Sequence, residues 1–512
     1  MDGKRGRALT AAQQKTGRFC LQETTIAGIQ QAFADGSISA RQLVELYLNR
    51  IEAYDRNGPQ INSIITVNPQ ALEDADRLDR DFGNNGLTGP LHGVPVILKD
   101  QMDARGMPTT LGSVVFRDYF PDRDCFVTEK LRQAGAIILA KATLGELGRG
   151  DTHGSLFGST RNPYDLARTP GGSSGGPGAS VSANLGAVAI GQEGFASIRR
   201  PAAWNGVTGI RPTAGLVSRG GVYAGWPGQP GSLGPLTRSV TDLAKMLDVM
   251  VGYDPDDPMT SFGVGQAPET FTDSLDGDGL KGVRIGVMTQ SMGFHSEPDS
   301  DDFRLVSQVF DRAAAELESA GATVVPMPEI PRLTELLAKR ASDGRNDEAW
   351  DRYYGRSENP PYASPEAMMQ SPDYAKVHRS KYAGTALTGP AAYAEYLLAR
   401  EELMFSVMKI MADAQLDAIV HKTVEHQPTL IAEGVGPPYY DMRGTTHINT
   451  YLVHVPSISV PAGFTSAGLP VGITFLGRPF SDPTMVKLAY AYEQATGHRS
   501  PPDSAPPLPG EP

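Results

Sequence analysis

From about residue 90 onward, short apolar runs alternate with segments of helical pattern along the chain. Runs rich in Val, Ile and Leu are typical of buried strands, and the segments between them carry the apolar spacing of helices. Strands that alternate with helices predict an α/β fold, in which a large mixed β-sheet is covered by helices on both faces. The runs are VPVILK, AIILAKA, VRIGVM, ATVVPM, LDAIV and SISVPA.

The segments around this core complete the predicted organisation. Ser39 and Gln42 form a capping box ahead of an apolar stripe made of Val44, Tyr47, Leu48 and Ile51, which predicts an amphipathic scaffold helix. We expect an N-terminal extension over 1–24, one domain over 25–498 and a helical insertion or cap over about 330–400. Residues 499–512 are rich in proline, and we expect them to form a disordered tail.

Composition excludes several classes of partner and cofactor. The net charge of −12 and the lack of a Lys/Arg cluster argue against nucleic acid. Two cysteines are too few for a disulfide framework or a thiolate metal site. No stretch approaches the ~18 apolar residues of a membrane span, so we expect a cytoplasmic protein with no membrane partner. A signal peptide removed before the first residue would leave no trace.

Residues 171–176 read GGSSGG, the densest serine and glycine tract of the chain. Taken alone, such a tract is as typical of a linker as of a functional turn. Here it follows the turn-forming segment RNPYDLARTP and leads into the helical pattern PGASVSANLG. This context predicts a tight turn at a helix N-terminus, where backbone N–H groups favour developing negative charge.

The same tract fits the G-x-S-x-G nucleophile elbow, centred on Ser173 or Ser174. An elbow needs a buried strand directly before the serine, and Pro163 and Pro170 argue against a central strand there. It also needs a histidine base, for which the downstream candidates are His421, His426, His447 and His454. We therefore disfavour the elbow. No phosphate-binding glycine pattern follows a strand either, so a nucleotide site is not expected.

A serine activated by a lysine remains as the favoured chemistry. Lys99 ends the run VPVILK, and a lysine at the end of a buried strand loses hydration, which lowers its pKa and favours the neutral base. Lowering that pKa from about 10.4 to about 7–8 costs on the order of 4 kcal/mol. The alternative is a surface lysine beside Asp100, and Lys99 alone does not decide between the two.

Together these segments resemble the amidase signature family. GVPVILKD, FGSTRNPYDLARTPGGSSGG, ASIRRPAAWNGVTGIRPT and SISVPAGFTSAGLPVGITFLGRPF stand in the family order, and the resemblance covers about 25–498, which would be the catalytic domain. It implies the amidase signature fold and a Ser-cisSer-Lys triad, with Ser197 as nucleophile, Ser173 as the bridging cis-serine and Lys99 as base. No cofactor and no metal are implied.

One segment departs from the family pattern. Members commonly carry glycines directly before the nucleophile, whereas this chain has Gly194, Phe195 and Ala196. The resemblance makes the backbone N–H groups of these residues the oxyanion hole. A positive φ at Phe195 or Ala196 would be strained, because both carry a Cβ atom. We expect activity to survive, with Phe195 narrowing the acyl site and with Glu193 and Arg199 forming a buried pair that holds the loop.

The resulting expectation is a serine hydrolase that cleaves the carbon–nitrogen bond of an amide, anilide or carbamate through an acyl-enzyme on Ser197. Its substrate would be small and hydrophobic or aromatic. Candidate substrate-binding residues are Leu147, Arg149, Ser174, Tyr223 and Trp226. Asp151 and His153 are equally compatible with a pocket wall and with an exposed turn.

The expected binding partner is a small-molecule amide substrate. A homodimer is also compatible with the sequence. Two alternative functions stay open. One is a glutamine-hydrolysing subunit of a tRNA-dependent amidotransferase, which passes ammonia to a partner subunit. The other is an inactive binding protein on an amidase scaffold, against which the intact Ser173, Ser197 and Lys99 argue.

Overall fold

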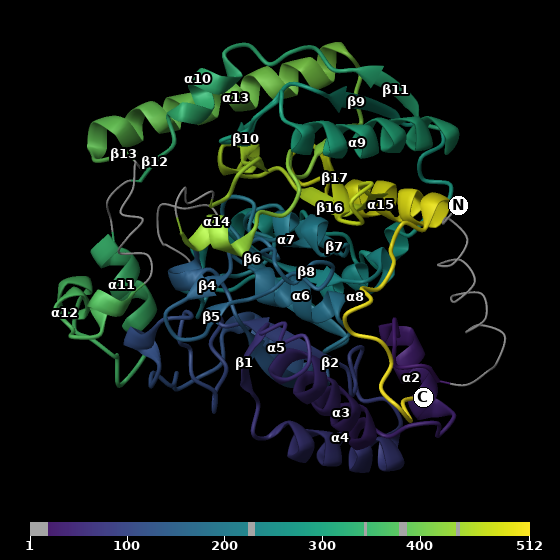
Figure 1. The fold of residues 1–512 in the computed structure, drawn as a ribbon, viewed down its shortest axis with the longest axis vertical. Helices are drawn as coiled ribbons and strands as arrows, with labels where there is room; N and C mark the ends of the chain where they lie inside the picture. Colours follow the sequence, from purple (N-terminus) through teal and green to yellow (C-terminus); the bar gives the residue numbers. More distant parts are fainter. Residues whose placement is uncertain (1–18, 224–230, 343–345, 378–386, 437–440) are drawn as a thin grey trace.

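The computed structural model describes residues 19–223, 231–342, 346–377, 387–436 and 441–512 (Figure 1). A mixed sheet of eleven strands forms the centre of this described part. From one edge to the other, its strands are β1 (Ile64–Val67), β3 (Ile137–Ala142), β2 (Pro95–Lys99), β6 (Val188–Glu193), β8 (Ser232–Thr237), β7 (Thr208–Arg211), β16 (Ser457–Phe464), β17 (Pro470–Leu476), β14 (Ala418–Lys422), β9 (Arg284–Met288) and β11 (Thr323–Pro326).

Parallel pairing occurs in two blocks of this sheet. β2 runs parallel to both β3 and β6, and β9 runs parallel to both β11 and β14. The pairs that connect β6 to β14 across the middle of the sheet are antiparallel. All residues of β2 are buried, as expected for a parallel strand covered on both faces. The six apolar runs lie in β2, β3, β9, β11, β14 and β16, and the predicted mixed sheet is confirmed.

Helices cover both faces of the sheet, as β7 shows. A Cβ atom at Gly209 would face Ile198 and Ala202 at the start of α7, whereas Ile210 packs in a cluster with α8 and α15. Successive strand residues point to opposite faces, so α7 lies opposite α8 and α15. The helices are α2 (Ile26–Ala34), α3 (Ala40–Arg50), α4 (Ala71–Asn85), α5 (Phe126–Gln133), α6 (Gly175–Ser182), α7 (Arg199–Trp204), α8 (Val240–Met250), α9 (Asp301–Ser319), α10 (Leu333–Ala338), α11 (Asn346–Tyr354), α12 (Pro365–Met369), α13 (Pro390–Asp413), α14 (Ile431–Val435) and α15 (Asp482–Thr496).

The predicted capping box is present at the start of α3. The Ser39 hydroxyl accepts a hydrogen bond from the Gln42 backbone N–H at 3.2 Å, and the Gln42 side chain accepts one from the Ser39 N–H at 2.9 Å. Val44 and Tyr47 are buried on the inner face of the helix. None of the described helices has the length and apolar character needed to cross a membrane.

The segment 330–400 is mainly helical and contains α10, α11, α12 and the start of α13. It also holds two short strands that the pattern did not reveal, β12 (Ala341–Ser342) and β13 (Leu387–Thr388), which pair in parallel. α11 and α12 lie apart from the long helix α13 in Figure 1 and pack beside the loops that follow β2. Trp350 and Tyr354 of α11 contact the ring of Phe116 there.

The C-terminal residues correct one prediction, because residues 499–512 are ordered against the body of the protein. The Leu21 N–H donates to the Pro512 carbonyl at 3.1 Å, and the Tyr164 hydroxyl donates to the Ser500 carbonyl. Proline removes backbone donors but leaves the carbonyls free to accept, and this tail is held by its carbonyls together with the side chains of Arg499, Ser504 and Glu511. The predicted N-terminal extension, 1–24, falls largely outside the described residues.

Arg50 makes several of the contacts that hold the tail. Its guanidinium is fully buried and pairs with the Glu511 carboxylate at 2.8 Å. It also donates to the carbonyls of Ala505 and Pro506 in the tail and to those of Ala183 and Asn184 after α6. One side chain therefore connects the tail to the end of the helix that follows the GGSSGG tract.

We predict that Arg50→Ala lowers the free energy of unfolding by about 3–5 kcal/mol, because it leaves a buried carboxylate and three carbonyls without their donor, while the Pro506 carbonyl keeps the Tyr54 hydroxyl. Urea denaturation followed by circular dichroism measures this loss. The matched control is Arg41→Ala, since Arg41 is 41% exposed and pairs with Glu45 and Asp76 at the surface. Its effect should stay below about 1 kcal/mol. Equal effects of the two substitutions would contradict the role assigned to Arg50.

Candidate active site

Lys99 ends β2 inside the sheet, between β3 and β6, and its side chain is fully buried. Its Nζ atom lies 2.7 Å from the Ser173 Oγ atom and 3.3 Å from the Gln192 carbonyl oxygen. Burial holds the pKa of Lys99 well below its usual range, and the Glu193 carboxylate opposes this by favouring the charged form. The surface alternative for Lys99 is therefore wrong, and the amine is placed to act as a neutral base.

The GGSSGG tract forms a tight turn that leads into α6, as its context predicted. The Gly172–Ser173 peptide bond is cis. A Cβ atom at Gly172 would lie 2.2 Å from the Gly150 carbonyl oxygen, so only glycine fits beside that loop. No strand directly precedes Ser173, which removes the structural basis of a nucleophile elbow.

Ser174 caps α6 and is fully buried. Its hydroxyl lies 3.2 Å from the Gln192 N–H, from which it accepts, and 3.3 Å from the Gln192 carbonyl, to which it donates. The hydroxyl therefore attaches the serine turn to β6. A substrate contact from Ser174 stays a prediction.

Ser197 lies in the turn between β6 and α7 and is half-buried. The Ser174 backbone N–H donates to the Ser197 carbonyl at 3.1 Å, which places the two serine-bearing turns side by side. The structure therefore brings Lys99 and Ser173 into direct contact, with Ser197 in the adjoining turn. Their three catalytic roles remain predictions.

A buried ion pair holds the turn that carries Ser197. The Glu193 carboxylate contacts the Arg199 Nε at 2.7 Å and accepts from the backbone N–H groups of Ile198 and Arg199 at 2.9 Å. Arg199 in turn donates to the Phe195 carbonyl at 3.2 Å. The expected buried pair of Glu193 and Arg199 is thus confirmed. It joins the residue before the turn, Glu193, to the residues after it.

The oxyanion segment, Gly194 to Ala196, avoids the strain that its sequence suggested. Neither Phe195 nor Ala196 is among the residues with positive φ. Within the described part of the chain, the backbone N–H groups from Gly194 to Ser197 donate no hydrogen bond to another residue. An oxyanion hole requires N–H groups of this kind beside the nucleophile, and this role of the segment stays a prediction.

Arg200 holds the turn that carries Ser173, a role that its sequence position did not predict. It donates to the Gly172 carbonyl from Nε at 3.1 Å and from Nη2 at 2.9 Å, and it pairs with Asp151 at 2.9 Å. Burial raises the pKa of Asp151 to about 7 despite the opposing effect of Arg200, and Asp441 adds to the rise. The available signal was a second arginine directly after Arg199 in an otherwise apolar helix.

The downstream histidines do not supply a base to the serine turns. Burial lowers the pKa of His421 to about 3 and that of His447 to about 4, so both are neutral and weakly basic. Among the described residues, no histidine is hydrogen-bonded to Ser173, Ser174 or Ser197. His153 bonds instead to Ser159 at 2.6 Å.

Two candidate substrate-binding residues come from segments attached to the triad. The Gly145 N–H donates to the Ser173 carbonyl at 3.0 Å, and this turn continues to the half-buried Leu147. Tyr223 exchanges backbone and side-chain hydrogen bonds with Gln101, two residues beyond Lys99. Arg149 is exposed, and Trp226 lies outside the described residues.

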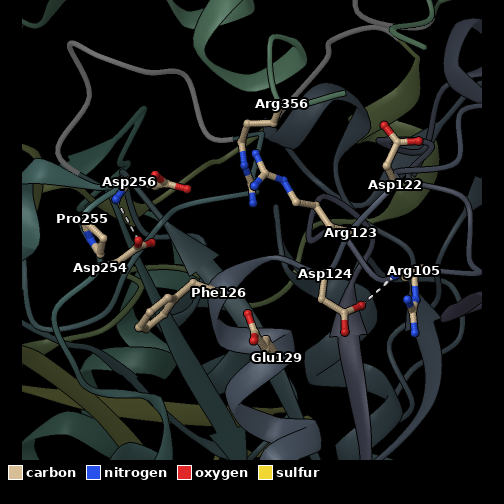
Figure 2. Close-up of a pocket in the computed structure, with 10 residues that line it drawn as sticks. All are labelled: Arg105, Asp122, Arg123, Asp124, Phe126, Glu129, Asp254, Pro255, Asp256 and Arg356. Atoms are coloured by element: carbon tan, nitrogen blue, oxygen red, sulfur yellow. Dashed lines mark hydrogen bonds between the residues drawn. The ribbon is translucent and has the colours of Figure 1, made fainter. Parts of the chain in front are cut away.

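A separate cavity of about 500 Å³ opens near α5 and contains no triad residue (Figure 2). Arginine and carboxylate side chains line it together, among them Arg123, Arg356 and Asp122. Asp122 already accepts from Ser357 and from the Glu358 N–H. No group of three or more His, Cys, Asp or Glu in the described ranges has the arrangement of a metal site.

Comparison with known proteins gives one consistent family. The Amidase family model matches residues 42–486. The chain is 34% identical over 482 residues to a glutamyl-tRNA(Gln) amidotransferase subunit of Methanosarcina barkeri, covering 91% of this chain and 96% of that protein. It is 33% identical over 506 residues to a probable amidase of Arabidopsis thaliana, covering 94% and 92%.

Solved structures agree with this relationship. The native peptide amidase of Stenotrophomonas maltophilia superposes with a TM-score of 0.80 at 33% identity, covering 94% of this chain and 99% of that one. The corresponding glutamyl-tRNA(Gln) amidotransferase subunit of Thermotoga maritima gives a TM-score of 0.70 at 27% identity, covering 94% and 98%. The chain therefore belongs to the amidase signature family of enzymes that hydrolyse carbon–nitrogen amide bonds.

Proposed function

We propose that the protein hydrolyses a small amide, anilide or carbamate with a hydrophobic or aromatic group, through an acyl-enzyme on Ser197. The observation that carries this proposal is the 2.7 Å contact between buried Lys99 and Ser173, beside the turn of Ser197. A lysine whose pKa is lowered by burial can accept a proton without any histidine.

The reaction follows from this arrangement. Neutral Lys99 takes the proton of Ser173, which takes the proton of Ser197 as the Ser197 oxygen attacks the carbonyl carbon. The tetrahedral oxyanion is stabilised by the free N–H groups of the oxyanion segment. The relay then returns a proton to the leaving nitrogen, the carbon–nitrogen bond breaks, and an ester remains on Ser197. Water repeats the cycle on this ester and releases the acid.

An apolar substrate group is supported by the residues next to the triad. Leu147 and Tyr223 pack against an aromatic and aliphatic cluster of loop 111–119 and of the segment 350–377. Tyr223 meets the Tyr353 ring edge-on at 5.5 Å. The Leu147 turn is bonded to Ser173, and Tyr223 is bonded to Gln101, two residues after Lys99. An apolar group attached to the scissile carbonyl would therefore meet this surface.

Glutamine hydrolysis is the second candidate, and the amidotransferase relatives favour it. In that role, the protein would release ammonia from glutamine for a partner subunit. The higher TM-score and identity to the peptide amidase than to the Thermotoga protein support the stand-alone hydrolase. The inactive scaffold is disfavoured, since the Lys99–Ser173 contact and the available N–H groups are both intact.

A serine-reactive fluorophosphonate should label Ser197, as peptide mapping by mass spectrometry would show. Ser197→Ala should abolish labelling and lower kcat/KM by at least about 10³-fold, because it removes the nucleophile. Ser180→Ala provides a matched control, since Ser180 is buried inside α6 and bonds the Pro177 carbonyl. Label on Ser173 or Ser174 that survives loss of Ser197 would overturn the assignment.

Lys99→Met should lower kcat by about 10²–10⁴-fold while the circular dichroism spectrum stays unchanged, because the base is lost and the apolar stem is kept. In the wild type, kcat/KM should fall as the pH drops through the lowered pKa of Lys99, since the protonated amine cannot accept a proton. Lys99→Arg should be inactive at every pH tested. The exposed Lys281→Met is the control, and activity of Lys99→Met near the wild-type rate would exclude lysine as the base.

A substrate panel separates the two candidate functions. We expect aryl amides and anilides to be hydrolysed with kcat/KM at least about tenfold above free glutamine, because a charged amino acid gains nothing from apolar surface. Ammonia release and product formation, measured by coupled assay and chromatography, provide the rates. Faster hydrolysis of glutamine, or its stimulation by a co-purified subunit, would favour the amidotransferase role instead.

A further inference from the structure

The ring of Phe195, in the oxyanion segment, is half-buried and contacts three side chains from other parts of the chain. It stacks on His447 with centroids 4.8 Å apart and planes only 8° from parallel. The Arg340 guanidinium carbon lies 4.5 Å from the same ring centroid, and Phe294 meets the ring edge-on at 6.4 Å. We call these four residues the Phe195 clamp.

The partners of Phe195 belong to elements outside the serine turns. Phe294 lies on β10 (Gly293–Phe294), which pairs with β15 (Thr445–Thr446), and His447 follows β15 directly. Arg340 lies between α10 and β12. Phe294 also contacts His447 edge-on at 6.4 Å. The clamp therefore connects the segment ahead of Ser197 to a small sheet from a later part of the chain.

The charges of the clamp are compatible with tight stacking. Burial and the nearby Arg340 lower the pKa of His447 to about 4, so the imidazole is neutral at physiological pH. A neutral ring beside Phe195 does not repel the guanidinium, and an arginine over an aromatic face is an attractive contact. Thus both the stack and the cation–π contact persist together.

The backbone of the oxyanion segment depends on few other contacts. The Phe195 carbonyl accepts from Arg199, whereas the N–H groups of Gly194, Phe195 and Ala196 donate to no residue within the described ranges. Donors of an oxyanion hole act only if their direction is fixed before reaction. A side chain held by Arg340 and His447 limits the movement of its own Cα atom, and therefore of the two peptide groups that flank it.

We propose that Phe195 is a positioning residue, whose clamped ring orients the N–H groups of the oxyanion segment without contacting the substrate. This inference rests on the proposed function, in which Ser197 forms the acyl-enzyme. Family members commonly carry glycine at this position, and here the ring fixes the backbone from outside the site. The expectation that Phe195 narrows the acyl site stays a separate prediction, which the KM of the Phe195 variants tests.

The test compares Phe195→Leu, which removes the ring, with Phe195→Tyr, which keeps it. We expect Phe195→Leu to lower kcat about 10–100-fold with KM changed less than about twofold, because misplaced donors weaken only transition-state binding. Phe195→Tyr should retain kcat within about threefold. The rate of fluorophosphonate labelling of Ser197 should fall in parallel with kcat, since the phosphoryl oxygen needs the same donors.

The chain offers a matched control in Phe303 of α9. Its ring also meets a cation and a histidine, Lys422 at 3.7 Å and His426 at 6.0 Å, but lies outside the serine turns. Phe303→Leu should therefore leave kcat and the labelling rate unchanged. Arg340→Met gives a second test that leaves the segment itself intact, and we expect it to lower kcat about 3–10-fold at constant KM.

Several outcomes would overturn the inference. A rise in KM at constant kcat for Phe195→Leu would make Phe195 a substrate contact. Labelling of Ser197 at the wild-type rate in Phe195→Leu would show that the clamp does not orient the hole, while the proposed function stands. Absence of label on Ser197 in the wild type would instead defeat the proposed function itself. If Phe195→Leu does not fold, unchanged kcat in Arg340→Met overturns the proposal.

Discussion

The burial of one amine sets the conditions for the rest of the site. Lys99 stands at the end of β2, with β3 on one side and β6 on the other, and desolvation favours its neutral form. An ordinary lysine would be protonated at neutral pH, and its ammonium group could only donate to the Ser173 hydroxyl oxygen, not accept its proton. In this protein, burial disfavours the ammonium form, so the amine stays unprotonated and can accept a proton where a histidine would otherwise be needed.

That condition also explains why Glu193 must be paired. A bare carboxylate near Lys99 would stabilise the ammonium form and cancel the effect of burial. Arg199 offsets the Glu193 charge through a 2.7 Å contact, and the backbone N–H groups of Ile198 and Arg199 at the start of α7 stabilise the carboxylate further. The same pair therefore limits the charge that Lys99 experiences and fixes the turn that carries Ser197. Geometry and electrostatics of the site depend on one ion pair.

The sequence predicted the parts of the fold that follow local rules. Continuous apolar runs identified β2 and β3, and the Ser39–Gln42 spacing identified the start of α3. β8 carries Gly234 and Pro235 in the middle of the sheet, where proline lacks a ladder donor, so pattern alone did not reveal it. The order of the tail was equally hidden, because its partner Arg50 lies far away in sequence.

In the candidate site too, local sequence patterns predicted some features, and contacts between distant segments determine the others. The residue types and order of Lys99, Ser173 and Ser197 were recognisable, whereas the roles of Arg200 and of the Phe195 clamp depend on contacts from distant segments. Arg200, which holds the Ser173 turn, donates to Thr445 of β15 at 3.1 Å. Phe195 of the oxyanion segment stacks on His447, the residue after β15. The N-terminal half of the chain carries the proposed reacting groups, and this later segment contacts the loops that bear them. A substitution near residue 445 would therefore act on the Ser173 turn and on the oxyanion segment together, although no residue there belongs to the triad.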